Sequence, residues 1–232
     1  MIEEPPVLTI NSNRRRPSAA QIAAFQGVPT GFVADAMQGG AALDRKIRPV
    51  LKDKALGGSV AGPALSVDCG PGDILATLAA LKVVMPGDMV IVAFAGHQGC
   101  AAAGDRVCGM MKNNGAAALI TDGPVRDYAG IAEIGLPVWA TGLTPESPFS
   151  KGPGKIGFPV QIGGRQVDSG DMIVADYDGV VVVPFDRIDE VIAAIETVRT
   201  LETELDAEVR DGLKIPPAME DFLASDAVVW TD

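Results

Sequence analysis

The sequence lacks a long apolar segment. No apolar stretch in its 232 residues approaches the roughly 20 residues that are needed to span a bilayer. Residues 1–6 also lack the basic stretch, followed by an apolar one, with which a secretion signal begins. We therefore expect a cytoplasmic protein without membrane association.

Clustered positive charge is scarce as well. With 19 Lys and Arg against 30 Asp and Glu, the formal net charge is −11, so nucleic acid and anionic lipid are poor electrostatic partners. The longest basic run is Arg14-Arg15-Arg16. These arginines could pair with an acidic neighbour, bind an anion or lie in solvent, and we favour the solvated arrangement. An anionic substrate must therefore meet specific local cations.

Cysteine and histidine are rare. Cys69, Cys100 and Cys108 are odd in number and show no C-x-x-C spacing, which argues against both a disulfide framework and a zinc site. We expect buried or partly buried free thiols. His97 is the only histidine. Its small-residue surroundings indicate a loop residue that supports a site, although an imidazole could also act as a base.

What the sequence does contain is typical of a globular chain. Apolar residues make up 47% of it, and glycine and alanine are abundant, a mixture that favours closely packed helix and sheet layers. The length suits one main domain. We divide the chain into an N-terminal arm (residues 1–17), a domain (residues 18–210) and a C-terminal tail (residues 211–232).

Apolar periodicity and turn signals predict an α/β domain. The nearly all-apolar strand at residues 88–95 implies that both faces of its sheet are covered, and Gly163-Gly164 predicts a tight hairpin turn. Residues 88–121 read as a β-α-β unit. Helices are predicted at residues 19–22, 30–37, 73–83, 104–113 and 186–210, and strands at residues 60–67, 88–95, 116–121, 138–141, 160–162, 166–167, 172–175 and 180–183.

The β-α-β unit indicates where a ligand would bind. The start of its helix lies beside the carboxyl ends of the two strands that the helix connects. Asp105, at the helix start, should therefore meet Arg126-Asp127 after the second strand, although 20 residues separate Asp105 from Arg126. The turn signal Asp122-Gly123-Pro124 favours a rim loop for Arg126. The free amides that would favour a carboxylate there are those of Gly104, Asp105, Arg106 and Val107.

The side chains suit the same chemistry. Arg126 could hold a carboxylate or an enolate oxygen in a bidentate manner, and Asp127 offers a hard oxygen ligand for Mg²⁺ or Mn²⁺. A purely structural alternative remains open, in which Asp105 caps its helix while Arg126 and Asp127 form a local turn and salt bridge. The residues alone predict a site and do not identify a reaction.

The glycine-rich turns resemble those of the RraA-like superfamily over roughly residues 28–205. That superfamily includes the class II 4-hydroxy-4-methyl-2-oxoglutarate / 4-carboxy-4-hydroxy-2-oxoadipate aldolases. The resemblance implies a layered β/β/α single domain, swivelling-domain-like, with a long C-terminal helix, and trimers or hexamers with sites between subunits. The motifs are Gly62-Pro63-Ala64, Pro71-Gly72-Asp73, Pro86-Gly87-Asp88, Gly104-Asp105, Gly123-Pro124-Val125-Arg126-Asp127, and Gly170-Asp171 followed by Asp178-Gly179-Val180-Val181-Val182.

The resemblance also implies roles for individual residues. Its substrate-binding turn falls on residues 104–107, its substrate-gripping arginine on Arg126 and its metal-binding aspartate on Asp127. Asp105 matches the acid that holds a metal-bound water. Lys151 falls near the position of a lysine close to the aldolase site, with Lys155 as the alternative.

Two further positions bear on the resemblance. The family draws a glutamate from the C-terminal helix of a neighbouring subunit, and Glu202 is the best match, with Glu196 and Glu204 as alternatives. Arg106 departs from the apolar residue expected after the aspartate. Its added cation would alter the preferred size or charge of the substrate, and the arginines at 14–16 could serve subunit contacts.

The implied reaction is cleavage of 4-hydroxy-2-oxo dicarboxylic or tricarboxylic acids, a retro-aldol reaction that depends on Mg²⁺, Mn²⁺ or another divalent metal and releases pyruvate. Oxaloacetate decarboxylation passes through the same enolate, so it is expected as a second activity. The alternative is an RraA-type regulator that masks an endoribonuclease by protein contact and performs no catalysis. A nucleotide-binding Rossmann domain is disfavoured, because no G-x-G-x-x-G loop follows a predicted strand.

Overall fold

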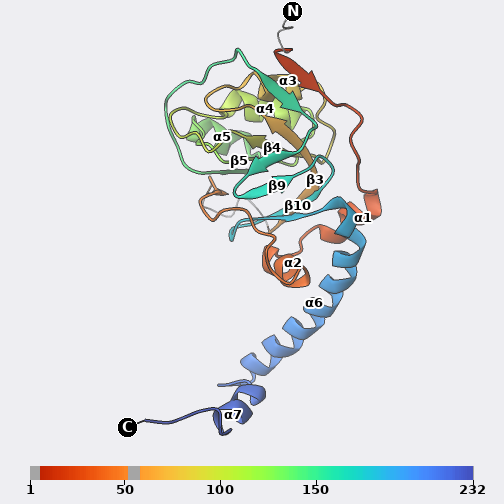
Figure 1. Cartoon of the computed structure of the whole chain (residues 1–232), viewed down its shortest axis with the longest axis vertical. Coiled ribbons are helices and arrows are strands. Elements are labelled where there is room, and N and C mark those ends of the chain that lie inside the picture. The colour runs from red at the N-terminus through yellow and green to blue at the C-terminus, as the bar shows by residue number, and fades with distance from the viewer. Residues whose placement is uncertain (1–5, 52–57, 232) are drawn as a thin grey trace, which may run out of the picture. The chain divides into compact units, whose positions relative to one another are not determined.

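The structure is a computed structural model that describes residues 6–51 and 58–231. The chain forms two compact units, Met1–Ile195 and Glu196–Asp232. Figure 1 shows the elements of the first unit. Its helices and the two that reach the second unit are α1 (Ala19–Phe25), α2 (Thr30–Ala36), α3 (Leu75–Ala80), α4 (Asp105–Asn113), α5 (Tyr128–Ile134), α6 (Ile188–Arg210) and α7 (Pro217–Leu223), with a 3₁₀ turn at Phe185–Arg187.

Nine strands of the described residues form one mixed sheet, and two more form a separate hairpin. The strands are β1 (Leu8–Ile10), β2 (Arg48–Pro49), β3 (Val60–Asp68), β4 (Met89–Ala93), β5 (Ala118–Thr121), β6 (Val138–Ala140), β7 (Gly154–Ile156), β8 (Val160–Ile162), β9 (Arg165–Val167), β10 (Met172–Ala175) and β11 (Val180–Val183).

The centre of the sheet is parallel. Strands β3, β4, β5 and β6 are neighbours in chain order, and each pairs in parallel with the next. Helices α3, α4 and α5 make the three connections and lie together in Figure 1. The predicted β-α-β unit is therefore confirmed as the middle one of three, and the carboxyl ends of β4 and β5 open onto the same edge of the sheet.

Strand β4 is covered on both faces, as its all-apolar sequence predicts. Val90 and Val92 belong to one buried cluster, which they share with residues of α4 and α5 such as Met111 and Ile131. Met89 and Ile91 point the other way, into a second buried cluster that contains residues of β8, β9 and β10. The two clusters lie between successive layers, which confirms the layered β/β/α arrangement.

The outer β layer continues from β3. Strand β10 pairs antiparallel with the first half of β3 and with β11. In the β8–β9 hairpin Ile162 pairs with Arg165, so Gly163 and Gly164 form the two-residue turn predicted for them. Both have positive φ, +54° and +76°, a conformation that glycine adopts at little cost and that suits a primed hairpin turn.

Helix α3 is shorter than predicted. The expected helix covers residues 73–83, but α3 ends at Ala80. The amides of Lys82 and Val83 then donate to the carbonyls three residues earlier, as in turns. Val83 and Val84 are β-branched and restricted in χ1 against a preceding helical turn, which favours this early end.

Several short elements were not predicted. Strand β1 lies within the proposed arm and pairs in parallel with β7, which was also missed. Helix α7 lies within the proposed tail. Strand β2 and helix α5 were also not predicted. Strands of two or three residues are too short to show a period, and their pairing depends on distant parts of the chain.

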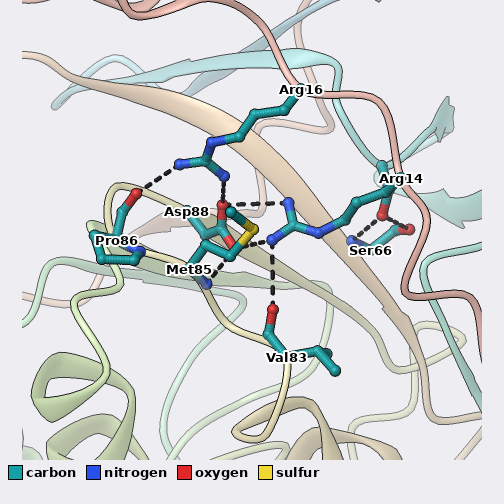
Figure 2. Close-up of polar contacts among 8 residues, drawn as sticks. Arg14, Arg16, Ser66, Val83, Met85, Pro86 and Asp88 are labelled. Atoms are coloured by element: carbon teal, nitrogen blue, oxygen red, sulfur yellow. Dashed lines mark hydrogen bonds and ion pairs between the residues drawn. The ribbon is translucent and has the colours of Figure 1, made fainter.

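The preference for solvated arginines was wrong for Arg14 and Arg16 (Figure 2). The Asp88 side chain is fully buried and forms ion pairs with both guanidinium groups. The Arg14 side chain is only 5% exposed, and the amide of Met85 also donates to Asp88 at 2.8 Å. Of the three alternatives left open, pairing with an acidic neighbour is the one observed.

Two further predictions concern membrane-spanning segments and the cysteines. Among the described residues, every helix is too short or too polar to cross a bilayer. All three cysteines are buried free thiols, as predicted. Burial raises the pKa of Cys69 to about 11 and that of Cys108 to about 12, so both thiols stay protonated near neutral pH.

Candidate functional site

Two loops at the carboxyl edge of the sheet are joined by backbone hydrogen bonds. The loop after β4 and the loop after β5 meet where Ala102 N–H donates to the carbonyl of Pro124 (2.8 Å) and Arg126 N–H donates to that of Ala103 (3.1 Å). These bonds place Arg126 beside the start of α4. The predicted meeting of the helix start with residues 126–127 is therefore present in the structure.

A pocket of about 280 Å³ opens at this junction. Its polar wall contains four charged side chains, two cationic and two anionic, and small apolar residues complete it. The volume is just below the usual range of about 300–1,000 Å³ for ligand pockets, which suits a small metabolite. The pocket is lined by Ile74, Ala101, Ala103, Gly104, Asp105, Arg106, Val107, Arg126, Asp127 and Pro148.

Asp127 has an unusual backbone conformation. It is the N-cap residue of α5 and lies in the left-handed region, with φ 63° and ψ 47°. Aspartate tolerates this region better than most residues, yet such a conformation still costs free energy and is concentrated at functional sites. Helix α5 therefore begins immediately after a residue that lines the pocket.

The close approach of Gly104 to Asp127 explains why this position is a glycine. A Cβ atom on Gly104 would lie 2.6 Å from Asp127 Oδ2 and 3.2 Å from Arg126 Cγ. The backbone of Gly104 is extended and would accept any residue. It is therefore the neighbouring site side chains, rather than the backbone, that exclude a larger residue.

Arg126 is held in place by two contacts. Its Nη1 donates to Ser147 Oγ at 2.6 Å, and its Nε lies 3.3 Å from Asp127 Oδ2. The salt bridge of the structural alternative thus exists. Both side chains nevertheless remain accessible from the pocket, at 37% exposure for Arg126 and 44% for Asp127, so a ligand can reach them.

Asp105 is the first residue of α4, and its N-cap is Gly104. The alternative in which Asp105 serves only as the N-cap is therefore wrong. The Asp105 carboxylate accepts the amide of Arg106 at 2.6 Å, so one of the four amides expected to face an anion already has a carboxylate partner. On its other side the carboxylate packs against Gly130 of α5, where a Cβ would lie 2.5 Å from Asp105 Oδ2.

The donor set suits a hard, partly hydrated cation. Asp105 and Asp127 both line the pocket, while within residues 6–51 and 58–231 no cluster of three or more His, Cys, Asp or Glu side chains could hold a metal. Mg²⁺ typically binds through one or two carboxylates and keeps several waters, whereas a structural zinc site needs four protein ligands. The residues present therefore fit Mg²⁺ or Mn²⁺ better than zinc.

The remaining predicted residues are Lys151, Glu202 and His97. The backbone amide of Lys151 donates to Asp73 Oδ2 at 2.6 Å, its side chain is exposed, and it does not line the pocket. Glu202 is half-buried on α6, in the second unit. His97 packs edge-on against Phe94, with ring centroids 5.7 Å apart. The roles assigned to Lys151 and Glu202 stay predictions.

Sequence reasoning missed Ser147 and Gly130. Ser147 follows Pro145 and Glu146 in a loop without periodicity, so no local signal connects it with Arg126. Gly130 lies within α5, and a glycine at a helix interior is normally unfavourable. That cost is the one signal that could have marked Gly130 as a position where another group approaches closely.

Comparison with known proteins identifies relatives of the chain. The profile of the RraA-like family, described as Aldolase/RraA, matches residues 30–182. A protein of Halalkalibacterium halodurans named "Putative 4-hydroxy-4-methyl-2-oxoglutarate aldolase" is 36% identical over 163 residues, which cover 70% of this chain and 76% of the relative. The two sequences therefore align over most of both chains.

Solved structures show the same fold. RraAS2 of Streptomyces coelicolor, an unusual member of the RNase ES inhibitor RraA protein family, superposes with a TM-score of 0.73 at 28% identity, covering 83% of this chain and all of that one. An uncharacterized protein of Pseudomonas syringae gives 0.77 at 22% identity, covering 87% and 93%. Because the family profile spans more than half of the sequence, the chain belongs to the RraA-like family.

Proposed function

We propose that the chain is a divalent-metal-dependent lyase that cleaves 4-hydroxy-2-oxo dicarboxylic or tricarboxylic acids and releases pyruvate. The observation that carries the proposal is that Asp105, Arg126 and Asp127 line one small pocket. The name of the Halalkalibacterium halodurans relative supports it. The active form would be a cytoplasmic trimer or hexamer with sites between subunits.

Arg126 supplies the fixed positive charge. In a retro-aldol reaction the bond between C3 and C4 breaks and its electron pair moves into a pyruvate enolate. A guanidinium group can hold the substrate carboxylate with two parallel hydrogen bonds and stabilise the developing enolate oxygen. Ser147 and Asp127 orient Arg126 before substrate arrives, so little reorganisation is needed in the transition state.

Asp105 would move the proton. The C4 hydroxyl must lose its proton as the bond to C3 breaks, and the enolate carbon must then gain one. Asp105 is fixed by the Arg106 amide and by Gly130, and its carboxylate can orient a water that accepts and returns this proton. No Schiff-base lysine is required, in keeping with the position of Lys151 outside the pocket wall.

Asp127, with Asp105 nearby, would hold Mg²⁺ or Mn²⁺. When bound, the metal would supply Lewis-acid stabilisation of the 2-oxo group and of the enolate charge. The same enolate arises when oxaloacetate loses its C4 carboxylate as carbon dioxide. Oxaloacetate decarboxylation is therefore part of the proposal as a second activity of this pocket.

The alternative function is protein binding without catalysis. It is favoured by the likeness to the Streptomyces coelicolor structure, which belongs to a family of RNase inhibitors. A regulator of this type would mask an endoribonuclease through surface contact and would not need Asp105 or Asp127. Glu202 separates the two hypotheses, because an aldolase needs the carboxylate of a neighbouring subunit whereas a regulator does not.

Metal removal is the first test of the lyase. Pyruvate release from 4-hydroxy-4-methyl-2-oxoglutarate and from oxaloacetate, coupled to lactate dehydrogenase, should require Mg²⁺ or Mn²⁺ and fall to background with EDTA. The variant Asp127→Ala should be inactive with metal present. Oxaloacetate rates are corrected for spontaneous and metal-only decarboxylation. A folded protein that releases no pyruvate with added metal would reject the lyase and favour the regulator.

Gly130→Ala tests the position of Asp105 without touching it. The added methyl group would meet the Asp105 carboxylate at 2.5 Å and must displace it, so we expect kcat to fall by about 10- to 100-fold, since small misplacements of a reacting group cost this much. Alanine also favours the helix. The new Cβ would also lie 2.6 Å from Asp105 Cβ, so α4 and α5 must shift slightly apart. Circular dichroism melts should therefore show a folded protein that is destabilised by about 1 to 3 kcal/mol, the usual cost of overpacking.

Gly109→Ala is the matched control for this substitution. Gly109 also lies inside a helix, but a Cβ there would make only an ordinary contact, 3.5 Å from Ile134 Cδ1. Its kcat should stay within about twofold of the wild type, because an ordinary van der Waals contact does not displace Asp105, whereas the misplacement of a reacting group is what slows a reaction. Equal losses in both variants would mean that the position of Asp105 is not what limits the reaction.

A further inference from the structure

We propose that Arg106 selects dicarboxylic substrates by binding the carboxylate that is distal to the 2-oxo group. The inference deepens the proposed function and rests on it, because it takes the ligand to be a 2-oxo acid held by Arg126. It concerns a residue whose identity departs from the apolar residue that the family resemblance predicts. Arg106 is thus assigned a specificity role and takes no part in bond cleavage.

The two arginines of the pocket differ in their partners. Arg126 is engaged by Ser147 Oγ and by Asp127. The Arg106 side chain lines the same pocket and is exposed, and within residues 6–51 and 58–231 its guanidinium group has no hydrogen bond or ion pair to another side chain. All the N–H donors of the Arg106 guanidinium group are therefore available to a ligand.

The other charges of the pocket do not neutralise Arg106. The Asp127 carboxylate lies against Arg126, at 3.3 Å from its Nε. The Asp105 carboxylate accepts the backbone amide of Arg106 and packs on Gly130. With one carboxylate of a substrate on Arg126, the charge left for a second anionic group is that of Arg106.

The position of Arg106 suits a second carboxylate. It is the second residue of α4, a nine-residue helix whose N-terminus faces the pocket, so the helix dipole adds to its attraction for an anion. A pocket of about 280 Å³ holds both ends of a small diacid within the reach of its walls. A guanidinium group binds a carboxylate in a bidentate manner, which lysine cannot reproduce.

The test compares two unreactive ligands of equal chain length. 2-Oxoglutarate and 2-oxopentanoate differ only in a terminal carboxylate or methyl group. Isothermal titration calorimetry with Mg²⁺ present would measure both dissociation constants for the wild type, Arg106→Leu and Arg106→Lys. Arg45→Leu removes the same charge from an exposed residue outside the pocket wall and serves as the control.

The wild type should bind 2-oxoglutarate about tenfold more tightly than 2-oxopentanoate, which is the effect of a hydrogen-bonded charge pair with partial solvent screening. Arg106→Leu should abolish this preference by weakening 2-oxoglutarate alone, Arg106→Lys should keep part of it, and Arg45→Leu all of it. A wild type without the preference or without 2-oxoglutarate binding, or a leucine variant that retains the preference, would overturn the proposal.

The binding result is independent of turnover. Selective binding that depends on Arg106, in a protein that releases no pyruvate, would retain the role of Arg106 and reject the lyase. Pyruvate release with no preference between the two ligands would retain the lyase and reject the role of Arg106.

Discussion

Replacement of Arg126 by methionine is expected to lower kcat/KM for pyruvate release by about 10²- to 10³-fold, the usual cost of removing one donor from an oxyanion site. Methionine keeps an apolar stem as far as the position of Nε while it removes all five N–H donors. The Asp127 carboxylate loses its partner at 3.3 Å, and Ser147 Oγ loses its donor. Steady-state kinetics on 4-hydroxy-4-methyl-2-oxoglutarate would measure the loss.

The division of this loss between kcat and KM shows what Arg126 does. A fall in kcat at unchanged KM means that the guanidinium group acts mainly on the enolate formed in the transition state, whereas a rise in KM alone means that it only anchors the ground state. Arg126→Lys should recover part of the activity through its charge. Arg45→Met, which alters an exposed arginine outside the pocket, should retain wild-type kinetics, and an equal loss there would point to a general charge effect.

Stability should change little in Arg126→Met. The side chain is 37% exposed and its ion pair with Asp127 is solvent-accessible, and exposed pairs contribute up to about 1 kcal/mol. A thermal melt close to that of the wild type would therefore separate loss of chemistry from loss of fold. A large drop in melting temperature would instead mean that Arg126 supports the loop between β5 and α5.

The candidate site could be located from the sequence because topology fixes it. The strands β4 and β5 are short apolar runs, and helix α4 between them has a clear period. A parallel β-α-β unit then leaves little freedom in where its two loops meet. Asp105 and Arg126 come together for this reason, although the sequence contains no sign of the backbone bonds that join the loops.

The details that sequence reasoning missed depend on distant contacts. Ser147 reaches Arg126 from a loop 21 residues away, and Gly130 is explained only by the carboxylate packed on it. Helix α5 starts at Asp127, a residue type that often caps helices, but Asp127 is left-handed and forms no side-chain cap. Such features follow from tertiary structure, and local patterns do not carry them.

The ion pairs of the arginine run at residues 14–16 likewise could not be predicted from local sequence. Three adjacent arginines in a polar segment most often lie in solvent, and nothing near residue 14 suggests otherwise. The partner of Arg14 and Arg16 is Asp88, more than 70 positions along the chain. The Asp88 side chain is fully buried, and a buried carboxylate requires compensating charge and hydrogen bonds. Figure 2 shows how this requirement is met.

Replacement of Arg14 by methionine should therefore destabilise the protein by about 3 kcal/mol, at the lower end of the range for breaking a buried ion pair by removing one partner. The lower end is expected because Asp88 keeps Arg16 and the amide of Met85. In a chain of this size the loss corresponds to a fall of about 10 °C in melting temperature. Circular dichroism or calorimetric melts would measure it.

Arg15→Met is the control that separates burial from charge. Arg15 also forms an ion pair, with Asp186 at 2.7 Å, but the two side chains are 51% and 79% exposed, and its guanidinium group also stacks over the Phe185 ring at 4.4 Å. Removing the same charge there should cost no more than about 1 kcal/mol, because water screens the pair. Equal destabilisation by both substitutions would mean that the N-terminal segment is held by general charge attraction. A loss confined to Arg14 would assign the cost to the buried carboxylate of Asp88.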